Sequence, residues 1–173
     1  MNWQEVCEHP SLKDLPFKIE LDELGKIIMS PVKLYHSILQ GEIEFLLRSL
    51  LKNGKALPEC AIKTSKGTKV ADVAWASTEL LNKIKMETEA SIAPEICVEI
   101  LSSSNSKREM LEKRQLYFKA GAKEVWLCNE NGYLSFFNSE GKLEQTGLRY
   151  VVKILKNHKH YLNKLLELLP NCF

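Results

Sequence analysis

Two acidic residues stand inside stretches of the chain that are otherwise apolar. Asp72 lies within residues 69–76 (KVADVAWA), and Glu99 lies within residues 96–101 (ICVEIL). Burying an ionised carboxylate is costly unless a cation, a metal ion or a raised pKa compensates it. Both residues are therefore candidates for a functional site. The structural alternative for Glu99 is an edge strand that turns this side chain toward water.

A helix expected after residue 106 carries the third candidate. On a helical wheel its apolar face holds Met110 and Tyr117, and Lys113 falls on the flank of that face, with Arg114 near its middle. In the structural interpretation, both basic side chains lay their stems over the core while their charged groups reach water. In the functional interpretation, one of these cationic groups points back toward the two carboxylates.

An Asp, a Glu and a Lys that meet at one point can hydrolyse a phosphodiester. Two carboxylates bind Mg²⁺ or Mn²⁺ through oxygen ligands and leave places for water and a phosphate oxygen. Such an ion lowers the pKa of its bound water and offsets charge in the transition state. A nearby lysine can position or deprotonate the attacking water, or stabilise the oxyanion. We therefore expect Asp72 and Glu99 to bind the metal and one of the two basic residues of the helix to assist water activation.

The rest of the sequence predicts a mixed α/β fold that positions these residues. Residues 17–30 are typical of two short strands about a turn at 22–25, and residues 33–52 have the apolar spacing of a helix. A strand–helix–strand unit from 95 to 128 implies two parallel neighbours in a sheet. The other expected elements are strands at 59–64, 69–76 and 133–138, a short helix within 78–93, and an amphipathic helix at about 150–169.

Composition narrows the class of protein. At 173 residues, of which 45% are hydrophobic, we expect residues 1–173 to form a single domain. The net charge of +2 is small, so any nucleic-acid surface has to be a local patch. The sequence has no signal pattern and no run of about 18 apolar residues, which favours a cytoplasmic protein without a membrane span. Cys97 and Cys128 are expected to be reduced thiols in the core.

Several stretches taken together resemble one known family. Residues 93–105 (APEICVEILSSSN) and 112–127 (EKRQLYFKAGAKEVWL) are similar to the cyanobacteria-rich restriction endonuclease family, a domain of unknown function in the PD-(D/E)XK nuclease superfamily. The resemblance covers about residues 17–138. The other matching stretches are 25–31 (GKIIMSP), His36 and 71–74 (ADVA).

This resemblance implies a restriction endonuclease-like core, with a mixed β-sheet flanked by helices and preceded by an N-terminal β-hairpin. It also implies DNA as the substrate. Asp72 and Glu99 match the two acidic positions of the family, and Lys113 matches a lysine on the helix that follows. The resemblance therefore implies that Lys113 is the residue that assists water activation. His36 also matches the family, and we expect it to cap its helix or pack locally rather than to act in catalysis.

Three departures from the pattern leave a second function open. Leu101 stands where the wider superfamily has its lysine, Ala71 where Pro is expected before the first acid, and Glu95 where the family usually has Asp. The alternative is a catalytically degenerate nucleic-acid-binding module, or a homodimeric interaction module, on the same fold. A homodimer also suits an endonuclease, because cutting both strands of a duplex needs two sites.

Overall fold

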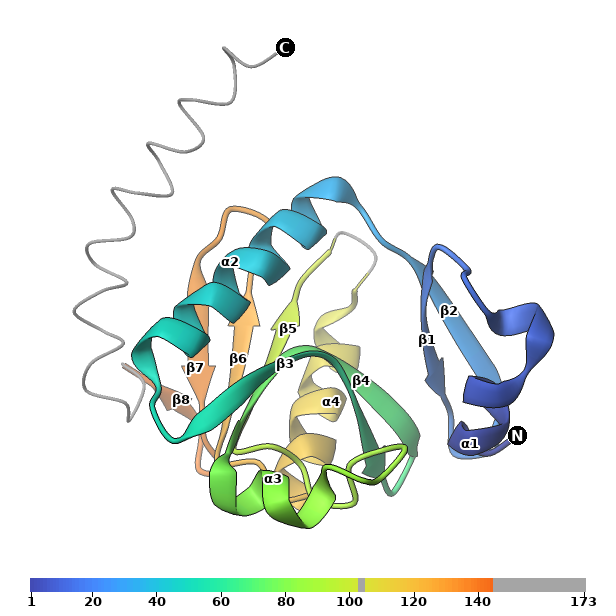
Figure 1. Ribbon diagram of the computed structural model, residues 1–173. Coiled ribbons are helices and arrows are strands. Elements are labelled where there is room, and N and C mark those ends of the chain that lie inside the picture. The colour runs from blue at the N-terminus through green and yellow to red at the C-terminus, as the bar shows by residue number, and fades with distance from the viewer. Residues whose placement is uncertain (103–104, 145–173) are drawn as a thin grey trace.

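A computed structural model describes residues 1–102 and 105–144, which form a six-stranded mixed sheet with helices on both faces and a two-stranded hairpin beside it (Figure 1). This is the α/β class, with the N-terminal hairpin, that the sequence predicts. The amphipathic helix expected at 150–169 lies outside the described residues. Within the described part, no helix combines the length and the apolar character that crossing a membrane requires.

The N-terminal hairpin turns where the sequence predicts it. Strands β1 (Phe17–Leu21) and β2 (Ile27–Pro31) pair antiparallel on either side of that turn. Ahead of them the sequence did not reveal helix α1 (Trp3–Glu8) or the 3-10 helix η1 (Pro10–Leu12). Helix α1 has only six residues and buries only Val6, so its sequence shows no repeated spacing of apolar residues from which a helix could be predicted.

The main sheet runs in the order β3-β4-β5-β6-β7-β8. Within it the β5–β6 pair is parallel and the other pairs are antiparallel. A helix joins β5 to β6, as the predicted strand–helix–strand unit requires. The strands are β3 (Gly54–Thr64), β4 (Gly67–Ser77), β5 (Ile96–Ile100), β6 (Glu124–Cys128), β7 (Leu134–Phe137) and β8 (Lys142–Leu143).

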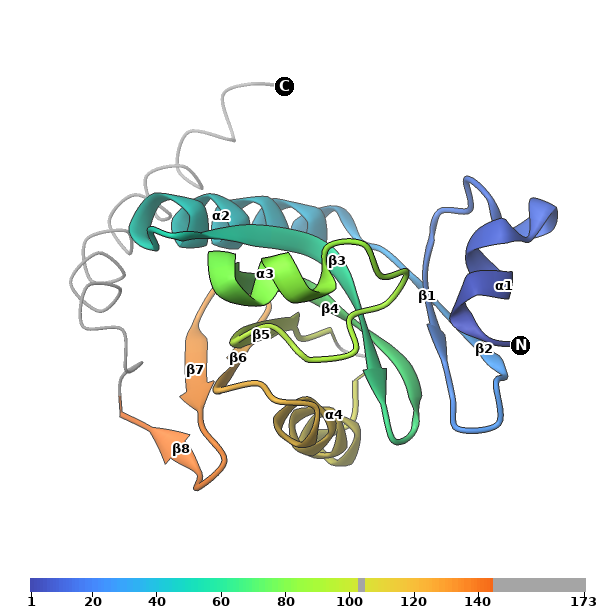
Figure 2. The same cartoon turned by 60° about the horizontal axis from the view of Figure 1, so that its bottom comes forward.

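Helices cover both faces of this sheet (Figure 2). They are α2 (Leu34–Leu50), α3 (Thr78–Ile84) and α4 (Lys107–Lys119). On one face, Leu47 of α2 packs in a cluster with Val98 and Trp126. On the other face, Tyr117 of α4 packs in a cluster with Cys97 and with residues of α3. The expected core thiols, Cys97 and Cys128, are buried and free.

The turn between β3 and β4 is where the N-terminal hairpin docks. Gly67 has a φ of +79°, and a Cβ at this position would lie 2.4 Å from the Leu21 carbonyl oxygen and 2.2 Å from that of Asp22. Glycine is therefore required both by the backbone conformation and by the close approach. Lys69 adds a hydrogen bond from Nζ to the Leu21 oxygen at 2.9 Å. Strand β1 thus lies against β4, and its side chains can reach the middle of β4.

We expect Leu47→Ala to lower the free energy of unfolding by about 3 kcal/mol, because it opens a cavity in the core beneath α2. Leu47 is 0% exposed, whereas Phe45 on the same helix is 58% exposed. The control Phe45→Ala should therefore change stability by less than about 0.5 kcal/mol. Equilibrium urea unfolding measures both values, and equal losses would contradict the packing described for α2.

Candidate active site

The two acidic candidates lie opposite each other at the point where β4 and β5 separate. The antiparallel ladder between these strands pairs Val73 with Val98. The next position in the same register places Asp72 opposite Glu99. There the Ile100 N–H donates to the Asp72 carboxylate at 2.6 Å. The strand register therefore brings together two carboxylates that are far apart in the sequence.

Glu99 is buried in a central strand, because β5 lies between β4 and β6 and the residue is only 4% exposed. The edge-strand alternative is therefore wrong. The Tyr117 hydroxyl donates to Glu99 Oε1 at 2.5 Å, and Lys113 Nζ donates to Oε2 at 3.1 Å. Burial raises the pKa of Glu99, and the opposing effects of Lys113 and Lys18 do not cancel it.

Lys113 points from α4 to the acids. It is 7% exposed, and its Nζ lies 2.7 Å from Glu20 Oε1 and 3.1 Å from Glu99 Oε2. The interpretation in which it reaches water is therefore wrong for Lys113, while Arg114 turns away and stacks on the Phe137 ring. Burial by itself lowers the pKa of Lys113, but the two carboxylates outweigh burial and raise this pKa above its ordinary value. The side chain stays an ammonium group at neutral pH.

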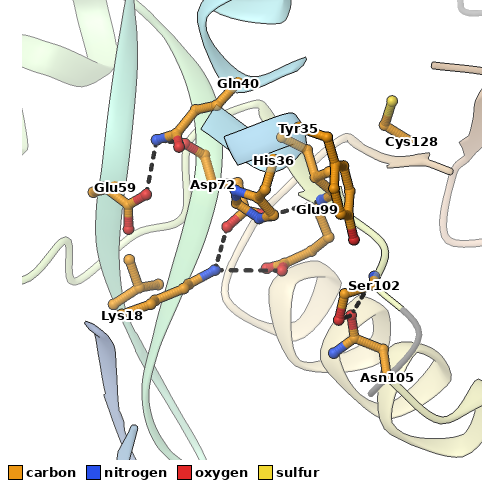
Figure 3. Close-up of polar contacts among 12 residues, drawn as sticks. Lys18, Tyr35, His36, Gln40, Glu59, Asp72, Glu99, Ser102, Asn105 and Cys128 are labelled. Carbon is orange, nitrogen blue, oxygen red and sulfur yellow. Dashed lines mark hydrogen bonds and ion pairs between the residues drawn. The ribbon is translucent and has the colours of Figure 1, made fainter. Parts of the chain in front are cut away.

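Asp72 is 1% exposed, and protein groups contact both of its carboxylate oxygens. Lys18 Nζ lies 2.5 Å from Oδ1, and His36 Nε2 lies 3.2 Å from Oδ2 (Figure 3). Burial opposes ionisation, but Lys18, His36 and the Ile100 N–H outweigh it and hold the pKa of Asp72 well below its ordinary value. His36, expected to cap or to pack locally, instead contacts the first acid from the first turn of α2.

Lys18 is a member of this cluster that the sequence did not identify. Its Nζ contacts both acids, at 2.5 Å from Asp72 Oδ1 and 3.6 Å from Glu99 Oε2 (Figure 3). Burial lowers the pKa of Lys18, but Glu99, Asp72 and Glu20 together hold it above the ordinary value. The charge between the two carboxylates is therefore a permanent cation at neutral pH.

Glu20, two residues further along β1, is the second unpredicted member. Its Oε1 accepts from Lys113 Nζ and from the Val70 N–H, the latter at 2.9 Å. Burial opposes ionisation, but Lys113 and Lys18 hold the pKa of Glu20 below its ordinary value. The one signal in the sequence is the alternation of Lys18 and Glu20 with apolar neighbours. A strand with one face in water produces the same pattern.

A cavity of about 700 Å³ opens onto the cluster between the hairpin, the start of α2 and α4. Seven carboxylates and five lysines line it, so its formal charge is −2 with His36 neutral. Such a lining attracts cations and repels a polyanion. Positive charge added to the cavity would therefore favour the approach of a phosphodiester to the acids.

The acidic pair is suited to bind a cation, because Asp72 and Glu99 already share one positive charge, the ammonium group of Lys18. Oxygen ligands of this kind suit Mg²⁺ or Mn²⁺. The described residues contain no cluster of three or more His, Cys, Asp or Glu side chains arranged as a ready metal site. A metal ion here would therefore have two protein carboxylates, with its other ligands supplied by water or substrate.

The three candidates predicted from the sequence, Asp72, Glu99 and Lys113, thus meet at one cavity, and the roles assigned to them stay predictions. A family model named Uma2, described as "Putative restriction endonuclease", matches residues 3–153 of the chain. The chain belongs to the Uma2 family. This confirms the family resemblance found in the sequence, and the match extends further toward both ends than the quoted motifs do.

A solved structure supports the fold of this Uma2 chain. It is described as a putative nuclease belonging to DUF820 from Anabaena variabilis ATCC 29413. The two share 21% sequence identity with a TM-score of 0.65, over 84% of this chain and 82% of the other. At this identity the comparison shows a common fold, which confirms the predicted architecture. A search of curated proteins gave no match.

We expect Asp72→Asn to lower the free energy of unfolding at pH 7 by roughly 3 kcal/mol, because it breaks a buried ion pair with Lys18. The pKa of Asp72 is lower in the folded state than in the unfolded chain, so its stabilisation is complete above about pH 4 and is lost as the pH falls further. The variant's stability should therefore vary less than that of the wild type between about pH 5 and pH 2.

Urea unfolding at a series of pH values measures this difference. Glu79→Gln, which removes an exposed carboxylate on α3, is the matched control and should keep the pH dependence of the wild type. If Asp72→Asn also keeps it, Asp72 does not carry the depressed pKa that its contacts imply.

Proposed function

We propose that this chain is a metal-dependent endonuclease that hydrolyses DNA phosphodiester bonds. The observation that carries the proposal is the convergence of Asp72 and Glu99 on one cation, with the Lys113 ammonium group 3.1 Å from Glu99. The Uma2 description supports a nuclease, and so does a fold shared with a chain described as one. DNA as the substrate rests on the same family description.

Asp72 and Glu99 would hold Mg²⁺ or Mn²⁺. When bound, the ion supplies positive charge for the phosphate and acidifies a coordinated water. Tyr117 keeps Glu99 oriented through its hydrogen bond to Oε1. The Ile100 N–H orients Asp72 in the same way, so both carboxylates are fixed before any ligand arrives.

Lys113 would act as a charged hydrogen-bond donor. Glu99 and Glu20 hold its pKa above the ordinary value, which favours the ammonium form. It can orient the attacking water or stabilise negative charge on the phosphate. Of the roles expected from the sequence, the charged form serves positioning and charge stabilisation directly, and deprotonation of the water would require this ammonium group to lose its proton first. The Lys113 ammonium group reaches the acids from α4. This is consistent with Leu101 occupying the position after β5 at which the wider superfamily has its lysine.

A non-catalytic nucleic-acid-binding module on the same fold is the second candidate. The observation in its favour is that Lys18 already supplies the acidic pair with a cation without a metal ion. Such a module would bind DNA with a strong dependence on salt and would not cut it when Mg²⁺ or Mn²⁺ is added. Either function is compatible with the predicted homodimer, which sedimentation measures.

Supercoiled plasmid incubated with the wild type and Mg²⁺ or Mn²⁺ should be nicked or linearised, and EDTA should stop the reaction. Asp72→Ala and Glu99→Gln should each lower the rate by about a thousandfold, because they remove a metal ligand. Lys113→Met should lower it by about a hundredfold, because it removes one charged donor.

Glu79→Gln, on the exposed face of α3, is the control and should cut like the wild type. Circular dichroism checks that each variant is folded. Cleavage that persists unchanged in Asp72→Ala would place the nuclease site elsewhere, and salt-dependent binding without cleavage in the wild type would favour the second candidate.

A further inference from the structure

The place that a metal ion would take between Asp72 and Glu99 is held by a side chain of the protein. Lys18 Nζ lies within 3.6 Å of an oxygen of each acid, and its side chain is 11% exposed. A divalent ion bound by the same two carboxylates would lie beside this ammonium group. Like charges so close together repel strongly in a buried site, so the two cations exclude each other.

An ammonium group that leaves the acidic pair needs another partner. Glu59 lies on β3 opposite Asp72, because the β3–β4 register pairs Pro58 with Val73 and Cys60 with Ala71. The Glu59 carboxylate is near enough to Lys18 and Asp72 for charge–charge interactions with both, and it accepts a hydrogen bond from Gln40 (Figure 3). Burial raises the pKa of Glu59, and Lys18 is the nearby charge that most opposes this rise.

The backbone holds Glu59 in this place at a cost. Its φ is +48°, a left-handed conformation that is rare for a residue with a side chain. Gln40 Nε2 donates to the Glu59 carboxylate at 2.7 Å and to the Asp72 carbonyl oxygen at 3.0 Å, so one amide fixes both residues. Strain of this kind is typical of functional sites.

We propose that Lys18 is a resident counter-cation of the acidic pair, that a divalent metal ion has to displace it, and that Glu59 receives the displaced ammonium group. The proposal rests on the proposed function, because it assumes that Asp72 and Glu99 bind the metal. Lys18 has a flexible four-carbon stem, so the exchange needs a rotation of one side chain. The hairpin stays docked through the Glu20–Val70 and Lys69–Leu21 hydrogen bonds.

Mn²⁺ binding to the full chain, measured by calorimetry and by the electron paramagnetic resonance signal of free Mn²⁺, tests the displacement. Lys18→Met keeps the length of the side chain and removes its charge, so it should tighten the Kd for Mn²⁺ by about tenfold or more. Lys26→Met makes the same change at an exposed position of the same hairpin and should leave the Kd within about twofold.

A Kd that is equal or weaker in Lys18→Met, with measurable binding in the wild type, would overturn this proposal and leave the metal-dependent function standing. No Mn²⁺ binding in either protein at millimolar concentration would overturn the metal-dependent function together with the proposal. Tightening in Lys26→Met equal to that in Lys18→Met would also overturn it, because the effect would then be one of overall charge.

A double-mutant cycle tests the part played by Glu59. Glu59→Gln removes the acceptor of the displaced ammonium, so it should weaken Mn²⁺ binding several-fold in the wild-type background and by less than about twofold in Lys18→Met. The coupling between the two changes is the supporting result. Equal weakening in both backgrounds would show that Glu59 acts on the metal directly, and would overturn its assignment as the acceptor.

Discussion

The pairing of two buried carboxylates with two buried ammonium groups is the interaction on which the rest of this structure depends. Asp72 and Glu99 cannot both be ionised side by side in an apolar sheet unless cations reach them. Lys18 and Lys113 supply these cations from two different elements, the hairpin and α4. Glu20 adds a third carboxylate and links the two lysines, so the five side chains form one network with a formal charge of −1.

Each large feature of the fold brings one part of this network into place. The β4–β5 register sets the acids opposite each other, and the α4 crossover after β5 brings Lys113 back over them. The hairpin contributes little to the two apolar clusters, and it reaches the acids because Gly67 allows its backbone to approach β4 closely. A side chain at Gly67 would push the hairpin outward and remove Lys18 and Glu20 from the site together.

The sequence predicted the parts of the site that lie inside strong local patterns. An acid within an apolar strand is unusual locally, so Asp72 and Glu99 could be identified from their neighbours, while the choice of Lys113 over Arg114 also needed the family resemblance. Lys18 and Glu20 could not be identified, because alternation of polar and apolar residues in a hairpin is ordinary. Their function depends on where the hairpin docks, which is a long-range contact without a local signature. Helices α1 and η1, which precede the hairpin, were not predicted because they are too short to show a repeated spacing of apolar residues.

The same network also limits what the lysines can do. Lys113 is held charged by two carboxylates, so the helix brings a cation to the site. Lys18 has no counterpart among the family positions matched in the sequence. It gives the acidic pair a cation in the absence of a metal ion. In the proposed exchange, a divalent ion would bind the two acids only by releasing the cation that they already hold. The cost of that release would then set the metal affinity, and the hairpin that carries Lys18 would belong to the proposed active site as well as to the fold.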